Sequence, residues 1–238
     1  MASLRVIPGE GKSAQDVAYH WLKRHVATLP RHEGTFLTEG EVSEATGTSR
    51  TPVREALLRL EAEGFLQIVP KKGAFVPPIS DSEIEAAMQA RALVEDWCVR
   101  RCVPVADSLS RELELMVERQ RKLEKRTVDF IECDREFHRA IVRVAGNPVL
   151  ASFYETLRDR QVRMGVGAIT SSRQRTRMVL DEHTAIVEAV RSGDAGAAAK
   201  AVASHLASTL AALHLPAVST WDLDTAGPLG DGEVGDNE

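Results

Sequence analysis

The chain has 238 residues, 43% of them hydrophobic, which is enough for two modest domains or one large one. Its net charge of −5 comes from residues 216–238, which hold six acidic residues and no lysine or arginine, while residues 1–215 are nearly neutral, with 30 basic against 29 acidic residues. Residues 216–238 also hold little apolar material and are expected to be disordered. The chain has no N-terminal apolar segment and no membrane-length apolar run, so we expect a cytoplasmic protein with no membrane contact. The three cysteines form no Cys-x-x-Cys pair, which argues against structural zinc and a disulfide framework.

The N-terminal segment predicts two helices before a turn. Residues 1–11 show no periodic pattern and are expected to form a mobile arm. Apolar residues then recur at helical spacing from Ser13 to about Leu29, and Ser13 is a suitable N-cap. A second, short helix is expected from Glu39 to Ala45, followed by a turn at Gly47.

The next helix has the pattern of a DNA-recognition helix. Its apolar face consists of Val53, Ala56, Leu57 and Leu60. The polar residues at its N-terminal end are Ser49, Arg50, Thr51 and Arg54. A helix N-terminus offers N–H groups and a positive dipole end to phosphates, and arginine suits bidentate contact with guanine. Taken alone, the pattern also fits an amphipathic surface helix with two exposed arginines.

The segment from Phe65 to Val76 predicts a two-stranded wing with a basic tip. β-forming residues flank the turn, where Lys71, Lys72 and Gly73 are candidates for contact with DNA phosphates. Without a neighbouring helix-turn-helix, two lysines at a turn would more simply be solvated. Residues 12–76 are therefore expected to form a winged helix-turn-helix.

Three blocks of sequence follow one another across this region. They are Ser49-Arg50-Thr51-Pro52-Val53-Arg54-Glu55-Ala56-Leu57, then Glu61-Ala62-Glu63-Gly64-Phe65-Leu66, then Pro70-Lys71-Lys72-Gly73-Ala74-Phe75-Val76. In this order they resemble the winged helix-turn-helix of the GntR superfamily of bacterial repressors. The resemblance implies that the exposed residues of the recognition helix and the wing bind a double-stranded DNA operator.

A linker and a helical domain are predicted to follow the wing. Residues 77–80 begin with two prolines and predict a stiff, extended connection, after which Asp81 or Ser82 can cap a helix that begins at Glu83. Nearly every segment of residues 81–215 has helical periodicity. The predicted fold class is therefore mainly α, with a winged helix-turn-helix followed by an all-α helical bundle.

Polar side chains interrupt the apolar stripes of three predicted helices. They are Asp134 and His138 between Val128 and Ala145, His183 between Met178 and Val190, and His205 between Asp194 and Leu213. Each histidine alone is more simply a hydrogen-bonded core residue. Four such groups would each cost about 1–3 kcal/mol if buried unpaired, and a divalent metal such as Zn²⁺, Ni²⁺ or Mn²⁺ would join them.

Further motifs surround these four residues. They are Asn147-Pro148, Glu182-His183 and Gly193-Asp194. The spacing resembles the metal site of the FadR-like C-terminal ligand-binding domain, the FCD domain, of one GntR subfamily. The resemblance implies that the four residues are metal ligands, and that an arginine on the first helix faces a carboxylate effector. Arg91 matches that position, although it could instead pair with Glu95 one turn later, and Arg158 and Arg163 are further candidates.

Together these features predict a ligand-responsive repressor that acts as a homodimer. Residues 81–215 would dimerise and hold a divalent metal and a small organic acid that controls operator binding. One alternative is a metal-dependent hydrolase, although Glu182 and Glu136, the nearest candidate bases, lie in no recognised catalytic motif. The other is a DNA-binding regulator in which the metal is structural or is itself the signal.

Overall fold

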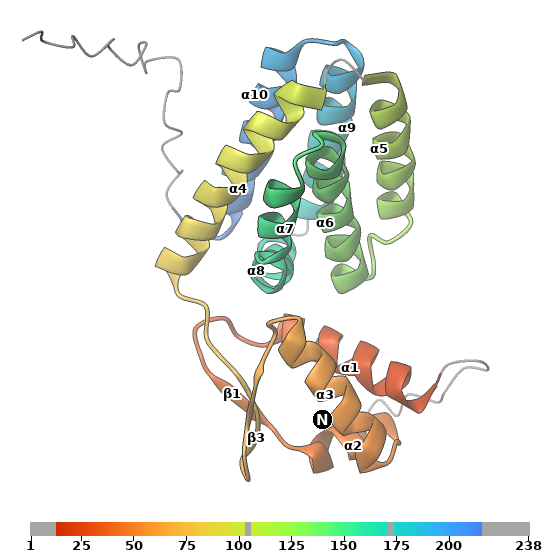
Figure 1. The fold of residues 1–238 in the computed structure, drawn as a ribbon, viewed down its shortest axis with the longest axis vertical. Coiled ribbons are helices and arrows are strands. Elements are labelled where there is room, and N and C mark those ends of the chain that lie inside the picture. The colour runs from red at the N-terminus through yellow and green to blue at the C-terminus, as the bar shows by residue number, and fades with distance from the viewer. Residues whose placement is uncertain (1–12, 103–105, 171–173, 216–238) are drawn as a thin grey trace, which may run out of the picture.

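A computed structural model describes residues 13–102, 106–170 and 174–215 of the chain. Figure 1 shows a small part, with a sheet beside helices, below a larger bundle of helices. The predicted fold class is therefore confirmed. The arm expected at residues 1–11 and the tail expected at residues 216–238 lie outside the described residues.

The small part begins with three helices whose ends are set by their caps. They are α1 (Ala14–Thr28), α2 (Glu39–Thr46) and α3 (Arg50–Ala62). Ser13 caps α1 by accepting a hydrogen bond from the backbone of Asp16, as predicted. Thr38 and Glu41 form a capping box at the start of α2, and Gly47 ends that helix with a φ of 66°.

The sheet of the small part has three strands, whereas the sequence predicted two. The strands are β1 (Thr35–Leu37), β2 (Gln67–Val69) and β3 (Gly73–Val76), in the antiparallel order β1-β3-β2. The additional strand, β1, pairs Phe36 with Phe75, and the centres of these two rings lie 4.8 Å apart. A segment this short cannot show the alternation that marks a strand, so β1 is defined by its pairing with β3.

The bundle consists of helices from the middle and C-terminal parts of the chain. They are α4 (Asp81–Cys102), α5 (Ala106–Arg121), α6 (Thr127–Val144), α7 (Pro148–Glu155), α8 (Arg158–Thr170), α9 (Arg175–Arg191) and α10 (Ala195–Ala212). The first begins before the predicted Glu83, because Ser80 rather than Asp81 or Ser82 forms a capping box with Glu83. Asn147 caps α7 and Asp194 caps α10.

Adjacent helices of the bundle enclose an apolar core. Helix α10 packs against α4 and α9, while α5 packs against α6 and α9. Fully buried Phe130, Phe137 and Ile141 project from α6 into this interior. The three cysteines are buried and free. Among the described helices, none combines the length and the apolar character that crossing a membrane requires.

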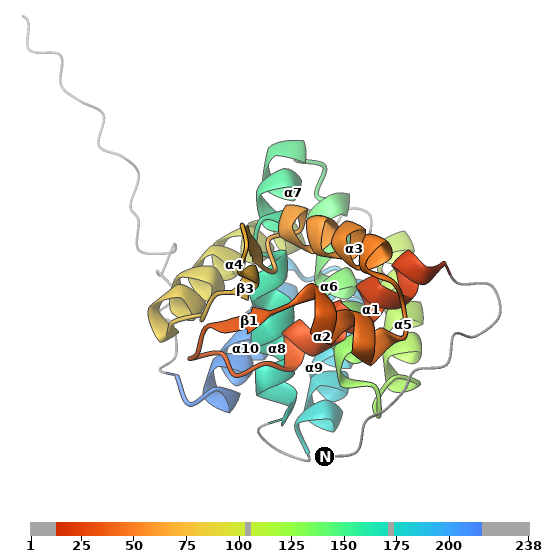
Figure 2. The same cartoon turned by 90° about the horizontal axis from the view of Figure 1, so that it is seen from below.

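The two parts meet through α1, which packs on α8. Seen from below in Figure 2, the small part lies across one end of the bundle. Two contacts of Arg31 hold the connection between the parts. The backbone N–H of Ile79 donates to the carbonyl of Arg31 at 2.6 Å, and Arg31 pairs with Asp81 at 2.6 Å.

Candidate metal centre and nucleic-acid interface

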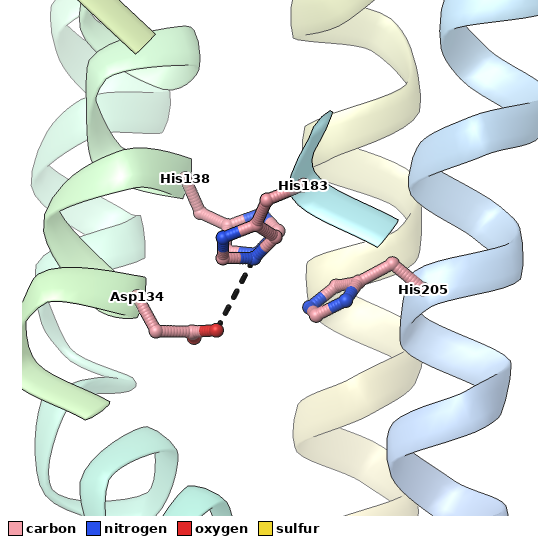
Figure 3. Close-up of side chains that lie close together, drawn as sticks. All are labelled: Asp134, His138, His183 and His205. Carbon is pink, nitrogen blue, oxygen red and sulfur yellow. Dashed lines mark ion pairs between the residues drawn. The ribbon is translucent and has the colours of Figure 1, made fainter. Parts of the chain in front are cut away.

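Four polar side chains from three helices meet inside the bundle. Asp134 and His138 come from α6, His183 from α9 and His205 from α10 (Figure 3). One potential ligand atom from each residue lies within 4.8 Å of the others. Asp134 and His138 are one helical turn apart and share a face of α6. The structure therefore brings together the four residues that the sequence singled out.

The Nδ1 atom of each histidine faces an acceptor on another helix. The contacts are His138 with Oε2 of Glu95 at 2.7 Å, His183 with Oε1 of Gln120 at 2.8 Å, and His205 with Oε2 of Glu182 at 2.8 Å. The contact with Glu95 is close but poorly aligned for a hydrogen bond. Carboxylates only accept, and Nε2 of Gln120 donates to the carbonyl of Phe130, which turns Oε1 toward its histidine. In the neutral rings of His183 and His205 the proton therefore sits on Nδ1 and the lone pair on Nε2, and the carboxylate of Glu95 beside Nδ1 favours the same arrangement in His138.

The Nε2 lone pairs at the centre of the cluster fit a cation. Nε2 of His183 lies 3.2 Å from Oδ1 of Asp134, and within the described residues neither it nor Nε2 of His138 has a hydrogen-bond partner. Two acceptors this close, in a site shielded from water, repel each other unless a proton or cation lies between them. The ring of His183 stacks on that of Phe137, with centroids 4.1 Å apart, and is held in place. Three imidazole nitrogens and one carboxylate oxygen suit Zn²⁺, Ni²⁺ or Mn²⁺.

Burial governs the charge of these groups. It lowers the pKa of His183 to about 4, even though Asp134 acts in the opposite direction. Burial also lowers the pKa of His205. Burial would raise the pKa of Asp134, but the surrounding histidines hold that pKa well below its usual range. At neutral pH the two imidazoles are uncharged and the carboxylate is ionised, which are the forms that bind a metal.

Two buried arginines balance the carboxylates that hold the histidines. Arg91 donates from Nε to Oε1 of Glu95 at 2.8 Å, and the hydroxyl of Tyr154 donates to the same oxygen at 2.5 Å. Arg175 donates from Nη1 to Oε1 of Glu182 at 2.7 Å. Burial would raise the pKa of both carboxyls, but their pairing with histidine and arginine lowers that of Glu182 to about 2 and that of Glu95 below its usual range. Both glutamates are therefore ionised.

The three arginines expected to face an effector occupy different places. Arg91 is buried against Glu95, which is the pairing that the sequence left open, and Glu95 connects it to His138. Arg163 of α8 donates to the carbonyl of Pro77 at 2.6 Å and so contacts the predicted linker. Arg158 begins α8, and its side chain lies outside the described part of the structure. The described contacts thus link Arg91 to the cluster.

Sequence reasoning missed two groups around the cluster, one that contacts a histidine and one that contacts Glu95. Gln120 lies on the buried face of α5 with Leu113 and Val117. A polar residue on an apolar stripe is the signal that identified the histidines, and the same signal would have found Gln120. Tyr154 reaches Glu95 across 59 residues of sequence, so no local spacing marks that contact.

The N-terminal end of α3 is exposed and has no acidic residue in its first turn. The exposed side chains there are Ser49, Arg50, Thr51 and Arg54. Ser49 is the N-cap residue, yet its hydroxyl makes no capping hydrogen bond. Arg54 donates from Nε to Oε1 of Glu39 at 2.6 Å while its side chain stays 66% exposed. This end of the helix therefore presents positive charge, N–H groups and a hydroxyl to an anionic partner.

The wing places two exposed lysines on a tight turn. Lys71 and Lys72 lie between β2 and β3, and Lys71 has a φ of 65°. Gly73 has a φ of 106°, and a Cβ atom there would lie 2.5 Å from the carbonyl oxygen of Leu37. Backbone geometry therefore requires glycine at this position, independently of the DNA contact predicted for it.

A winged helix-turn-helix joined to an all-helical domain is the architecture of a DNA-binding regulator with a separate sensing domain. Residues 14–76 match the family described as bacterial regulatory proteins, gntR family, and residues 86–208 match the FCD domain. The chain belongs to the GntR family of bacterial regulatory proteins and carries its FCD domain. It is therefore a transcriptional regulator and not an enzyme, which overturns the hydrolase alternative.

Similar proteins carry regulator names. The chain is 30% identical over 194 residues to the HTH-type transcriptional repressor RspR of Escherichia coli K12, covering 79% of this chain and 83% of that protein. It is 29% identical over 183 residues to a probable D-xylose utilization operon transcriptional repressor of Paenarthrobacter nicotinovorans, covering 75% and 79%. The solved structure of E. coli McbR/YncC has the same fold, with a TM-score of 0.62 at 24% identity over 85% of this chain and 98% of that one.

Proposed function

We propose that this regulator is a repressor that binds its operator as a homodimer, under the control of a divalent metal and a small carboxylate. The observation that carries the proposal is the convergence of Asp134, His138, His183 and His205, whose Nδ1 contacts leave the Nε2 atoms facing the cluster. The repressor names of two relatives support the direction of control.

The charges around the cluster favour an anionic effector. Asp134 contributes one negative charge, while Glu95 and Glu182 are each paired with a buried arginine, Arg91 and Arg175 respectively. A divalent cation would therefore leave a net positive charge in a buried site, where charges interact strongly. Four protein donors also leave positions open on an ion that accepts five or six ligands, and a carboxylate can fill them.

On the DNA side, we propose that the N-terminal end of α3 enters the major groove. Arg50 and Arg54 would reach base edges, with Ser49 and Thr51 on the phosphate backbone. Glu39 holds Nε of Arg54, so the two Nη groups can act together on one guanine. Lys71 and Lys72 of the wing would contact neighbouring phosphates. In a homodimer, two such helices would meet successive major grooves of a near-palindromic site.

The test combines elemental analysis with fluorescence anisotropy on DNA from the region upstream of the gene. We expect near-stoichiometric metal in the protein purified without chelator, loss of that metal in His205→Ala, and unchanged nonspecific DNA affinity. His32→Ala, which alters an exposed histidine of the small part, is the control and should keep the metal. Full metal occupancy in His205→Ala would contradict the ligand assignment, and no specific DNA binding at moderate salt would contradict operator recognition.

A purely structural or signalling metal is the second candidate. The cluster joins α6, α9 and α10, and its outer contacts reach α4 and α5, so an ion there would stabilise most of the bundle. A thermal-shift screen of small carboxylic acids with Zn²⁺ and with EDTA separates the two candidates. Stabilisation by an acid that disappears in EDTA supports the metal-assisted effector site. Stabilisation by Zn²⁺ alone, with no response to any acid, supports the second candidate.

A further inference from the structure

A buried lysine joins the small part to the helix that carries two of the cluster residues. Lys23 of α1 is 9% exposed, and its Nζ lies 2.6 Å from Oε1 of Glu132 on α6. The same Nζ lies 3.9 Å from Oε2 of Glu63, the C-cap residue of α3. A buried ammonium is costly to desolvate unless carboxylates hold it. The position of α1 against α6 is therefore tied to this ion pair.

The contacts of Glu63 continue the connection to the recognition helix. The hydroxyl of Tyr19 on α1 donates to the two carboxylate oxygens of Glu63, at 2.8 and 2.9 Å. Arg59 of α3 pairs with Glu63 at 3.3 Å, and its guanidinium lies 3.7 Å from the centre of the Tyr19 ring. Helices α1 and α3 are thus held as one unit, so that a displacement of Lys23 displaces α3 as well.

On the other side, Glu132 is rigidly connected to the cluster. It precedes Asp134 by two residues on α6, a separation of about 200° and about 3 Å in an α-helix, so the two side chains leave the helix on opposite faces. Arg135 holds Glu132 at 3.4 Å and Glu136 at 2.8 Å. Because α6 is one continuous helix, a movement of Asp134 and His138 on binding an ion is carried to Glu132.

The surroundings of this ion pair are not close-packed. A cleft of about 330 Å³ that opens to solvent lies between α1, α3, α5 and α6. Its lining is mostly polar or charged and includes Tyr19, Lys23, Arg59, Arg119, Glu132 and Glu136. At this point the polar contacts, more than apolar packing, therefore set how the small part is oriented on the bundle.

We infer that the ion pair between Lys23 and Glu132 is the joint through which the cluster controls the recognition helix. Lys23 and Glu132 are positioning residues, since they act through α3 and α6 and not by contact with bases or an ion. The claim that the cluster controls the recognition helix through this ion pair rests on the proposed function. The claim that the ion pair orients the small part on the bundle rests only on the contacts of Lys23, Glu63, Glu132 and Tyr19.

The test uses full-length Glu132→Gln and Lys23→Met, with operator affinity measured in Zn²⁺ and in EDTA. Glu112→Gln is the matched control, because Glu112 pairs at 2.6 Å with Arg143 near the other end of α6, on the surface of the bundle. Allosteric coupling of the usual size gives the wild type an affinity ratio of about 5 to 150 between the two conditions. We expect Glu132→Gln and Lys23→Met to keep their zinc. Their operator affinities in Zn²⁺ and in EDTA should differ by less than about twofold, whereas Glu112→Gln should keep the ratio of the wild type.

The double variant Lys23→Met with Glu132→Gln should lose no more of the ratio than either single variant, because both remove the same contact. If Glu132→Gln binds zinc and keeps the affinity ratio of the wild type, the inference is overturned and the proposed function stands. Absence of zinc or of any ratio in the wild type would overturn the proposed function instead. In that case hydrogen exchange in EDTA decides on the joint: faster exchange in α1 of both joint variants supports it, and exchange equal to that of the wild type overturns it.

Discussion

Replacing Glu182 with glutamine tests whether the groups behind the histidines tune the proposed metal centre. Oε2 of Glu182 accepts from Nδ1 of His205 at 2.8 Å, and Oε1 accepts from Arg175 at 2.7 Å. Glutamine keeps the shape of the side chain and removes its charge, which weakens the acceptor behind His205. Loss of such an outer partner lowers metal affinity about 10- to 100-fold, or about 1.4–2.7 kcal/mol.

The same replacement affects stability in a defined pH range. Pairing with His205 and Arg175, working against burial, lowers the pKa of Glu182 from 4.5 to about 2 in the folded state. The ionised carboxylate therefore contributes stability that is fully present above about pH 4.5 and is lost as the pH falls to about 2. In Glu182→Gln the metal-free protein should lose about 1–3 kcal/mol at pH 7, and its stability should change less across that acid range.

Competition with a chromophoric chelator for Zn²⁺ at pH 7 measures the affinity, and urea unfolding in EDTA measures the stability. Glu188→Gln makes the same chemical change at an exposed position of α9 and should alter neither quantity. If Glu182→Gln bound zinc as tightly as Glu188→Gln, the contact with His205 would have no influence on the centre, and the reasoning would be refuted.

The remaining predictions concern DNA binding, the wing, the thiols and the imidazoles. Arg50→Ala should weaken specific operator binding by about 1–3 kcal/mol in anisotropy titrations without changing the unfolding curve, and unaltered affinity would remove Arg50 from the interface. Gly73→Ala should destabilise the small part by about 1–3 kcal/mol or more, because its Cβ would meet the Leu37 carbonyl; wild-type stability would contradict this. Burial raises the pKa of Cys98 to about 12 and those of Cys102 and Cys133 to about 11, so iodoacetamide at pH 8 should alkylate the unfolded chain and leave the native one unmodified. The pKa of His183 falls from 6.5 to about 4 on folding, so the metal-free protein should lose stability as the pH drops from about 6.5 to about 4. Urea unfolding midpoints that stay constant over that pH range would contradict a neutral buried imidazole.

Local signals in the sequence were sufficient for the helices. Ser13 caps the helix that it was expected to cap, because a cap acts on backbone groups two or three residues away. The strand β1 was missed for the opposite reason. Its partner is Gly73–Val76, and pairing between segments so far apart in sequence leaves no periodic pattern in a strand of three residues.

The candidate site likewise has a part that the sequence could predict and a part that it could not. Periodicity placed Asp134 and His138 on one face of a helix and marked His183 and His205 as polar residues on apolar faces. It could not show which acceptor each ring would face, because those partners lie on other helices. The pairing of Arg91 with Glu95 was foreseeable because it spans a single helical turn.

The strand β1 also constrains how this protein can read DNA. It leads directly into α2 and pairs with β3, so the wing is tied by backbone hydrogen bonds to the start of the helix-turn-helix. Gly73 brings the wing against Leu37, immediately before the cap of α2. If the wing lysines and the recognition helix both contact a half-site, as proposed above, they must approach it as a single rigid body. A base-pair insertion between the bases that the helix would read and the phosphates that the wing would touch could not be accommodated by swinging the wing alone. The length of the half-site should then be as invariant as its sequence.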